Sequence, residues 1–295
     1  MDQFKICCGK KEFKINIEYI KYFCGKNESD KFSIYNSLKS CFSKTPNSEY
    51  ALETQLKHYV CFNDKIIDPK KWMFFEINKY FDIDTDIKLG TKSLLLKYLE
   101  SFKEDIESSD IFNTLSILFE SFNAEIIDPI INKDIQEKRL DFRLDSLSSQ
   151  LLLKNIYALI FQKDFETNYG DFNYEDLFIF QLNIIETIAS KNKDKFILLY
   201  LDISFITDSI RNAIERLKYK NCYVFINCIE TPKIDINLLC LFSKSYWDFS
   251  NIELINENIL DLPFHIFDFD LLRNVQEIVD GKFNDENLKI RNKIF

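Results

Sequence analysis

The feature that most constrains the fold is a pair of uninterrupted apolar runs in the C-terminal third of the chain. Residues 196–203 and residues 222–229 carry large apolar side chains with almost no polar alternation. Such runs are typical of strands that are buried on both faces of a sheet. Between them, Thr207 or Asp208 can cap a helix that extends to about Leu217. The strand–helix–strand order predicts a parallel sheet with a right-handed crossover.

Five further segments extend this pattern. Residues 13–24 are predicted to form a strand with a buried end, and residues 59–62 and 72–77 are predicted to form two more strands. Residues 31–42 place their apolar side chains on one helical stripe. A short third strand of the C-terminal α/β pattern is predicted at residues 251–254.

A block of helices separates the two parts of this sheet. Residues 91–195 repeat apolar side chains at helical spacing and contain one glycine and one proline. The helical stretches are residues 94–102, 111–122, 140–161 and 174–189. We therefore expect an α/β head domain made of residues 1–90 and 196–295. Residues 91–195 would be inserted into it as a helical bundle or a long antiparallel helix pair.

Composition excludes several classes of protein. The chain has 295 residues, a formal charge of −9 and 46% hydrophobic residues, which excludes a disordered chain. Its longest clean apolar runs are about six residues, whereas a membrane span needs ~20, and no apolar h-region follows Met1. We expect a cytoplasmic protein that does not contact a membrane. His58 and His265 stand far apart and the eight cysteines form no C-x-x-C pair, which argues against a zinc site or a Ser-His-Asp triad.

The loop between the first predicted strand and the first helix has the spacing of a phosphate-binding motif. That motif has two glycines separated by four residues, followed by lysine and then serine or threonine. Gly25 and Lys31 keep this spacing, but Asp30 replaces the second glycine and Phe32 replaces the hydroxyl residue. Asp30 places a carboxylate where phosphate would bind, and Phe32 cannot hold magnesium. Ser33 comes one position late and faces about 100° away on the helix.

The second part of a nucleotide site is also incomplete. The apolar strand at residues 198–201 ends in Asp202, but Ile203 stands where hydrolytic enzymes of this kind have a glutamate that orients water. The degenerate nucleotide loop comprises Gly25, Lys26, Lys31, Ser33 and Asp202. We predict that it contains no catalytic residue and that the protein binds no ATP. A chance Gly-Lys loop in an unrelated α/β fold is an alternative interpretation.

A decayed loop, a helical insertion and a strand ending in Asp202 resemble the P-loop-like head domain of ABC and SMC proteins. Within this class the chain is most similar to the longer subfamily of the Csn-two family, the adaptation protein of type II-A CRISPR loci. The resemblance spans about residues 13–270. The matching motifs are residues 20–27 with Lys31, Ile34, Tyr35 and Leu38, residues 87–95, residues 195–203, residues 222–229, Glu253-Leu254 and residues 260–263.

This resemblance implies a function as well as a fold. It implies a homotetrameric ring that encloses double-stranded DNA, prefers free DNA ends and has no catalytic activity. It also implies a role in the acquisition of new spacers, with the CRISPR integrase complex and the effector nuclease as partners. Calcium is an implied cofactor, but the resemblance assigns no calcium ligands to residues of this chain.

The distribution of charge bears on DNA binding more than the net charge does. Residues 1–45 carry nine lysines and five acidic residues, a local charge of +4, so the remainder carries −13. The excess of lysine over arginine favours contact with phosphates over the reading of bases. The candidate DNA-binding residues are Lys10, Lys11, Lys14, Lys26, Lys39, Lys44, Lys191 and Lys193. A solvated lysine-rich face with no ligand is the simpler alternative.

Two other functions stay open at this point. One is an active ABC/SMC-type ATPase that tolerates Asp30 and Phe32. The other is a scaffold that binds only proteins, with the acidic insertion as its partner surface, since residues 100–150 carry twelve acidic and five basic residues.

Overall fold

The computed structural model describes residues 1–42, 58–122, 124–125, 147–153, 161–162, 165–166, 172–218, 220–228, 235–243, 246–250 and 277. The chain divides into two compact units. Unit 1 comprises Met1–Phe81, Tyr174–Leu182 and Lys193–Phe295, and unit 2 comprises Asp82–Asn173 and Asn183–Asn192. The division into a head and an insertion at residues 90 and 195 stays a prediction, as does Lys44, which lies outside the described residues.

Unit 1 is built on a six-stranded sheet, sheet B, in the order β12-β11-β3-β10-β9-β6. Its strands are β3 (Ile20–Cys24), β6 (Trp72–Asn78), β9 (Phe196–Asp202), β10 (Cys222–Asn227), β11 (Leu239–Phe242) and β12 (Tyr246–Asp248). All neighbours are parallel except β11 and β12. The predicted mainly parallel α/β sheet is therefore confirmed. So is the helix after β9, α9 (Asp208–Glu215), which the side chain of Thr207 caps.

A second sheet, sheet A, is antiparallel and was not expected from the sequence. It has the order β2-β1-β4-β5, formed by β1 (Asp2–Cys8), β2 (Lys11–Ile17), β4 (His58–Phe62) and β5 (Lys65–Ile66). The prediction of one strand over residues 13–24 is wrong, because this segment belongs to two strands in two sheets. β2 alternates buried and outward side chains, whereas every residue of β3 is buried, so the pattern changes between them.

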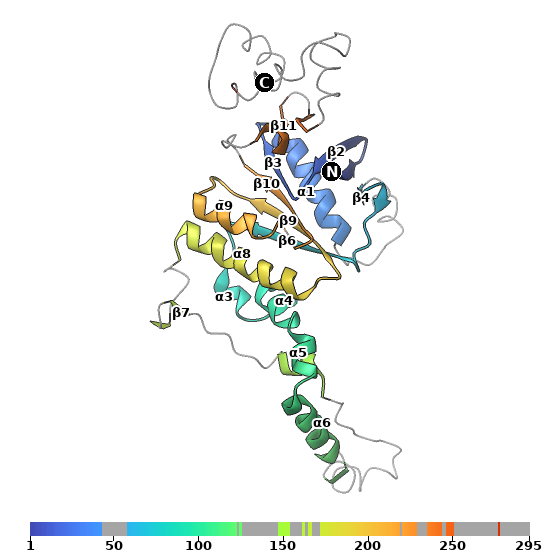
Figure 1. The fold of residues 1–295 in the computed structure, drawn as a ribbon, viewed down its shortest axis with the longest axis vertical. Helices are drawn as coiled ribbons and strands as arrows, with labels where there is room; N and C mark the ends of the chain where they lie inside the picture. Colours follow the sequence, from blue (N-terminus) through green and yellow to red (C-terminus); the bar gives the residue numbers. More distant parts are fainter. Residues whose placement is uncertain are drawn as a thin grey trace. The chain divides into compact units, whose positions relative to one another are not determined.

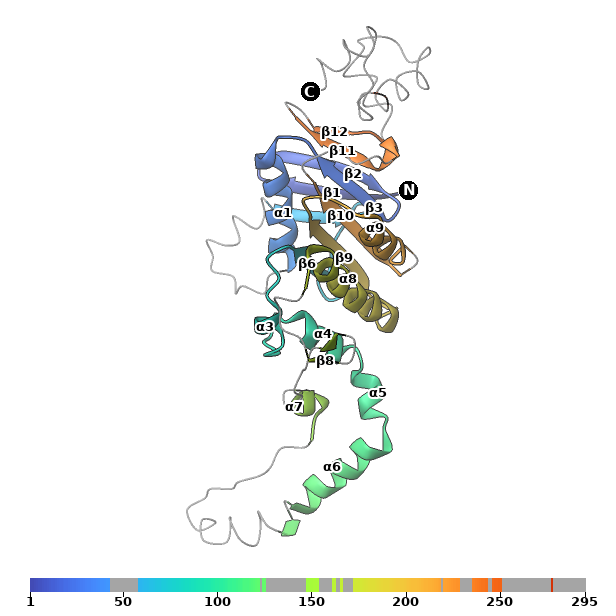
Figure 2. The same ribbon diagram turned by 90° about the vertical axis from the view of Figure 1, so that its left-hand side faces the viewer.

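The core of unit 1 lies between sheet A and sheet B, with α1 (Glu28–Phe42) packed into it. Figures 1 and 2 show α1 and sheet A over one face of sheet B, with α9 and the first half of α8 (Tyr174–Lys191) along the other. The buried ring of Phe4 links the two sheets. Its centroid lies 5.0 to 5.7 Å from the rings of Phe62, Trp72, Tyr223 and Phe225. Aromatic pairs of this kind add about 0.5–1.5 kcal/mol each beyond the area that they bury.

Unit 2 is mostly helical in the described ranges. It contains α3 (Ile83–Asp86), α4 (Leu94–Glu100), α5 (Lys103–Glu107), α6 (Asp110–Phe122), α7 (Ser149–Leu153) and the short strands β7 (Phe161–Gln162) and β8 (Phe165–Glu166). The buried Asp86 carboxylate accepts hydrogen bonds from the backbone N–H groups of Leu94 and Leu95, which fixes the start of α4.

The helices predicted at residues 94–102, 111–122 and 174–189 are confirmed in type, with small shifts of their ends. The helix predicted at residues 140–161 falls mostly outside the described residues. Its described part is helical in α7, but Phe161 belongs to a strand, so the prediction is wrong at that end. The strand predicted at residues 251–254 also lies outside them. In the part of the chain that the structure describes, no helix is long and apolar enough to cross a membrane.

Candidate functional site

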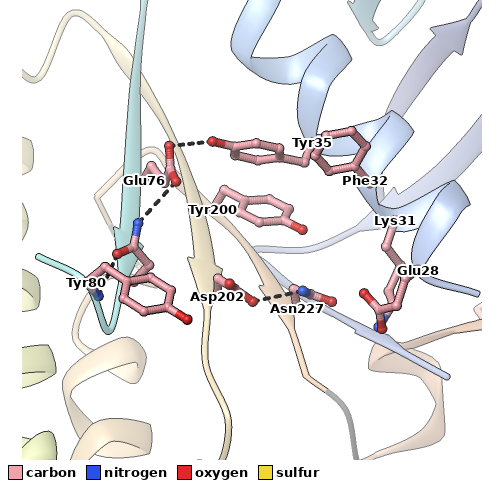
Figure 3. A pocket seen from close by; sticks show the side chains of 10 residues that line it. Glu28, Lys31, Phe32, Tyr35, Glu76, Tyr80, Tyr200, Asp202 and Asn227 are labelled. Carbon is pink, nitrogen blue, oxygen red and sulfur yellow. Dashed lines mark hydrogen bonds and ion pairs between the residues drawn. The ribbon is translucent and has the colours of Figure 1, made fainter. Parts of the chain in front are cut away.

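A pocket of about 330 Å³ lies where the parallel strands of sheet B end, beside α1 (Figure 3). Helix α1 lines it with Glu28, Lys31, Phe32 and Tyr35. Sheet B and the turn after β6 line it with Glu76, Asn78, Tyr80, Tyr200, Asp202 and Asn227. Ligands of open α/β sheets bind at the carboxyl ends of the strands, so this position favours a binding site.

Strand register places the polar groups of the sheet at one level. Asn78 pairs with Asp202, and Asp202 pairs with Asn227 on the next strand. The Nδ2 of Asn227 donates a hydrogen bond to Oδ1 of Asp202 at 2.8 Å (Figure 3). The Oδ1 atom of Asn227 is buried and has no hydrogen-bond partner among the described residues. A buried amide oxygen without a donor costs about 1–3 kcal/mol, which makes it a candidate ligand contact.

Lys31 brings a buried positive charge to the same pocket. Its side chain is 1% exposed, and its Nζ lies 2.5 Å from a carboxylate oxygen of Glu28. The ion pair is close, but within the described ranges no acceptor meets Nζ in hydrogen-bonding geometry. Glu28 is 66% exposed, so its charge is partly screened by water. The charge of the ammonium is therefore balanced by Glu28, but its hydrogen-bonding capacity is not met by the described residues.

Glu76 is the most fully bonded carboxylate of the pocket. It accepts hydrogen bonds from the hydroxyl of Tyr35 at 2.7 Å, from Lys39 at 3.0 Å and from Nδ2 of Asn78 at 3.1 Å. Burial raises the pKa of the hydroxyls of Tyr35 and Tyr200 above the usual range. Both tyrosines therefore stay protonated at neutral pH and can donate hydrogen bonds.

The loop before α1 packs against the backbone of β11. Gly25 has φ +100°, and a Cβ atom there would overlap the carbonyl oxygen of Phe242. The same carbonyl accepts a hydrogen bond from the backbone N–H of Asn27 at 3.1 Å. Only glycine permits this contact, so Gly25 is explained by packing without any phosphate.

Asp30 occupies the N-terminus of α1. It is 7% exposed and accepts hydrogen bonds from Nζ of Lys11 at 2.5 Å and from Nδ2 of Asn27 at 3.1 Å. Its own backbone N–H donates to the side chain of Asn27, which caps the helix. A paired carboxylate thus uses the positive end of the helix dipole, where a phosphate would otherwise bind.

The structure brings together only part of the predicted nucleotide loop. Lys31 and Asp202 line one pocket, whereas Gly25, Lys26 and Ser33 do not. Lys26 is exposed on the loop, and the hydroxyl of Ser33 donates to the backbone carbonyl of Ser29 at 2.8 Å. Sequence reasoning missed Tyr200 and Asn227 as pocket residues. The available signal was their position at the ends of apolar strands, since Tyr200 shares a face with Asp202 and Asn227 ends its own strand.

The predicted DNA-binding lysines are exposed where the structure describes them, but several of them already form ion pairs with acidic side chains. Lys11 pairs with Asp30, Lys14 with Glu12 at 3.8 Å, Lys39 with Glu76 and Lys191 with Asp105 at 2.6 Å. Lys10, Lys26 and Lys193 make no ion pair with any described residue. These three lysines carry charge that a polyanion could use.

Two thiols lie side by side on β3 and at the end of β10. The Sγ atoms of Cys24 and Cys228 are 3.0 Å apart, and both side chains are buried. The hydrogen bond to Cys228, together with burial, raises the pKa of the Cys24 thiol far above the usual range. A buried thiol with a raised pKa is a poor nucleophile, so we assign Cys24 to packing, with the buried Cys228 beside it.

A metal centre is not evident in the described ranges. They contain no group of three or more His, Cys, Asp or Glu side chains placed to hold an ion. Calcium binding stays a prediction of the family resemblance.

A scan against protein-family models and a search of curated proteins find no match. Among solved structures, the crystal structure of Stu0660 of Streptococcus thermophilus matches with a TM-score of 0.65 at 16% sequence identity. The match covers 99% of this chain and 92% of Stu0660. At this identity the likeness shows that the two chains share a fold.

Proposed function

We propose that the chain is a non-enzymatic protein of the Csn-two family that binds the ends of double-stranded DNA as a homotetrameric ring. We infer the absence of ATP chemistry from Asp30, whose carboxylate is buried and paired at the N-terminus of α1. Three further carboxylates, Glu28, Glu76 and Asp202, line the pocket against one lysine. A triphosphate would meet net negative charge there.

A degenerate P-loop-like head is part of this proposal. In its favour, β3 leads through the Gly25 loop into α1, and β9 ends in Asp202 at the same edge of sheet B. Close backbone packing explains Gly25, so the loop is stable without a nucleotide. The fold then serves as a rigid support for a lysine-bearing surface.

DNA binding is supported by the exposed lysines of unit 1. Lys10 lies in the turn between β1 and β2, Lys14 on the outward face of β2, and Lys26 on the loop before α1. Their ammonium groups can contact phosphates without reading sequence. Each neutralised phosphate releases counterions, so the affinity should fall steeply as salt is raised.

A gel-shift titration of linear and closed circular duplex of equal length, across a range of salt concentrations, tests this function. We expect tighter binding of the linear duplex and a tetramer by light scattering. Combined Lys10→Glu and Lys26→Glu substitutions should weaken binding of linear DNA by at least about tenfold at low salt, because two phosphate contacts become repulsive. Combined Lys70→Glu and Lys71→Glu substitutions, at two other exposed lysines, are the control with an equal change of charge and should change binding little. A monomer that binds neither the linear nor the circular duplex would refute the proposal.

The apolar surface of α6 favours protein binding as a second candidate function. Ile111, Ile117, Leu118 and Phe122 are 75%, 63%, 58% and 47% exposed. Exposed apolar clusters of this kind often mark interaction surfaces. Co-purification of a protein partner that resists nuclease treatment and is lost in Ile117→Asp would favour this second function.

A further inference from the structure

The pocket beside α1 contains donors and acceptors that no described residue satisfies. The buried ammonium of Lys31 keeps free N–H groups, and the buried Oδ1 of Asn227 lacks a donor. Asp202 accepts one hydrogen bond from the described residues, which leaves its second oxygen available. Figure 3 shows these groups along one side of the pocket, with the hydroxyl of Tyr200 directed toward them. A ligand that fits must offer donors and an acceptor together.

Aromatic rings form the walls and the mouth of the pocket. The rings of Tyr200 and Tyr35 pack with their centroids 5.1 Å apart, and both residues line it. Phe32 and Tyr80 also line it, although these residues are 61% and 76% exposed. Large aromatic side chains held in water at a pocket mouth are suited to stacking on a flat ligand.

The charges of the pocket exclude simpler ligands. A triphosphate would meet three carboxylates and one lysine, and the charge of that lysine is already balanced by Glu28. An organic cation would satisfy Asp202 and Asn227 but would leave the N–H donors of Lys31 without an acceptor. A metal ion would have no group of three acidic, histidine or cysteine ligands in the part of the chain that is described.

We infer that this pocket binds a nucleobase that carries an exocyclic amino group, and that it binds the base without phosphates. An amino group supplies two N–H donors, one for Asp202 and one for Oδ1 of Asn227. The ring nitrogen or carbonyl beside the amino group accepts from Lys31. Thymine has one ring N–H and no amino group, so it leaves one of the two oxygens without a donor. Tyr80 stacks on the exposed face of the base.

The base can come from a free nucleoside or from an unpaired nucleotide at a DNA end. The second source rests on the proposed function. Exposed Lys26 lies on the loop before α1, and exposed Lys79 directly precedes Tyr80. The Nζ atom of Lys79 lies 5.2 Å from the ring of Tyr80. A backbone phosphate would contact such lysines outside the acidic pocket while the base enters it.

Calorimetric titration of the full chain with deoxycytidine, deoxyadenosine and thymidine tests the pocket itself. We expect both amino-bearing nucleosides to bind more tightly than thymidine. Tyr80→Ala should weaken their binding by at least about fivefold, the lower end of a lost base–aromatic stack. Phe205→Ala is the matched control, since Phe205 is 56% exposed and stacks on Tyr174 but does not line the pocket. Both substitutions remove exposed rings, so both variants should fold.

The inference is overturned if no nucleoside binds, if thymidine binds as well as the amino-bearing nucleosides, or if Phe205→Ala weakens binding as much as Tyr80→Ala. Duplexes with a blunt end, a one-cytosine overhang and a one-thymine overhang then distinguish the two sources. Tighter binding of the cytosine overhang assigns the pocket to DNA ends, and equal binding assigns it to free nucleosides. If no duplex binds at all, the proposed DNA function fails while the nucleoside titration still decides the pocket.

Discussion

Two lysines of unit 1, Lys21 and Lys31, are each 1% exposed, but their surroundings differ. Lys21 on β3 pairs with Asp248 at 2.5 Å and donates to the carbonyl of Asn237 at 2.8 Å and to the hydroxyl of Ser250 at 3.0 Å. Lys31 has one exposed carboxylate beside it and no acceptor in hydrogen-bonding geometry among the described residues. A buried ammonium whose hydrogen bonds are all formed within the protein holds its neighbouring elements together. A buried ammonium that lacks hydrogen-bond acceptors is available to a ligand.

The largest expected effect on stability comes from breaking the buried ion pair between Lys21 and Asp248. Lys21→Met should lower the free energy of unfolding by about 3–5 kcal/mol, because it leaves the Asp248 carboxylate buried without its cation. Urea denaturation followed by circular dichroism measures this loss. The double variant Lys21→Met with Asp248→Leu should recover part of it. A single variant as stable as the wild type would show that the bonds around Lys21 do not stabilise the fold.

The next largest effect is expected at Gly25, in the loop that precedes α1, the helix on which Lys31 lies. Gly25→Ala should destabilise the protein by about 1–3 kcal/mol, because alanine is strained at φ +100° and its Cβ would overlap the carbonyl oxygen of Phe242. Gly90→Ala is the matched control, since an added Cβ there meets nothing within 4 Å. It should leave stability unchanged or raise it by about 0.4–1 kcal/mol. Thermal melting of both variants checks the difference, and equal melting temperatures would contradict it.

Lys31→Met should have a smaller effect and, unlike Lys21→Met, should not lower the free energy of unfolding. The substitution removes an incompletely bonded buried charge and leaves only the exposed carboxylate of Glu28. We expect the free energy of unfolding to stay the same or to rise by about 1 kcal/mol. Urea denaturation beside Lys21→Met gives the comparison directly. A loss as large as that of Lys21→Met would mean that Lys31 is structural.

The smallest expected effect is a loss of stability at alkaline pH, to which the surroundings of Lys21 and of Lys31 should contribute alike. Burial raises the pKa of Tyr22, next to Lys21 on β3, to about 12, and it also raises the pKa of Tyr200 in the pocket. A group whose pKa is raised on folding stabilises the native state fully below its unfolded pKa, near 10, and this stabilisation is lost as pH rises through its folded pKa. Stability should therefore hold up to about pH 10 and fall between about pH 10 and 12. Tyr22→Phe should flatten that fall, as urea titrations at each pH would show, and an unchanged slope would count against the burial of Tyr22.

Much of the fold could be predicted because burial leaves a pattern in local sequence. The apolar runs of β9 and β10 predicted two central parallel strands, and Thr207 predicted the start of α9. Sheet A could not be predicted in the same way. Its strand β2 runs almost directly into β3, and β1 also pairs with β4, which follows only after β2, β3 and α1. Pairing between strands that are far apart in the chain, such as β1 and β4, is not encoded in local periodicity.

The features of the candidate site that depend on residues close together in the sequence could be predicted. Asp30 and Phe32 predicted a loop that does not bind phosphate, and the spacing of Lys31 from Gly25 singled out this lysine as a candidate site residue. Neither residue type nor spacing indicated that Lys31 would be buried while Lys26 stays exposed. The pairing of Asp30 on α1 could not be predicted either, because its partner Lys11 lies on β2 of sheet A.

By itself, the sequence determined the α/β class and the parallel centre of sheet B, because each depends on residues close together in the chain. Only the tertiary structure decided which side chains line the pocket. Asp202 and Asn227 meet because two strands pair in register, and Lys31 and the aromatic rings join them because α1 packs on that face. Contacts between distant segments depend on how the layers dock, and the free energy of docking is spread over the whole core.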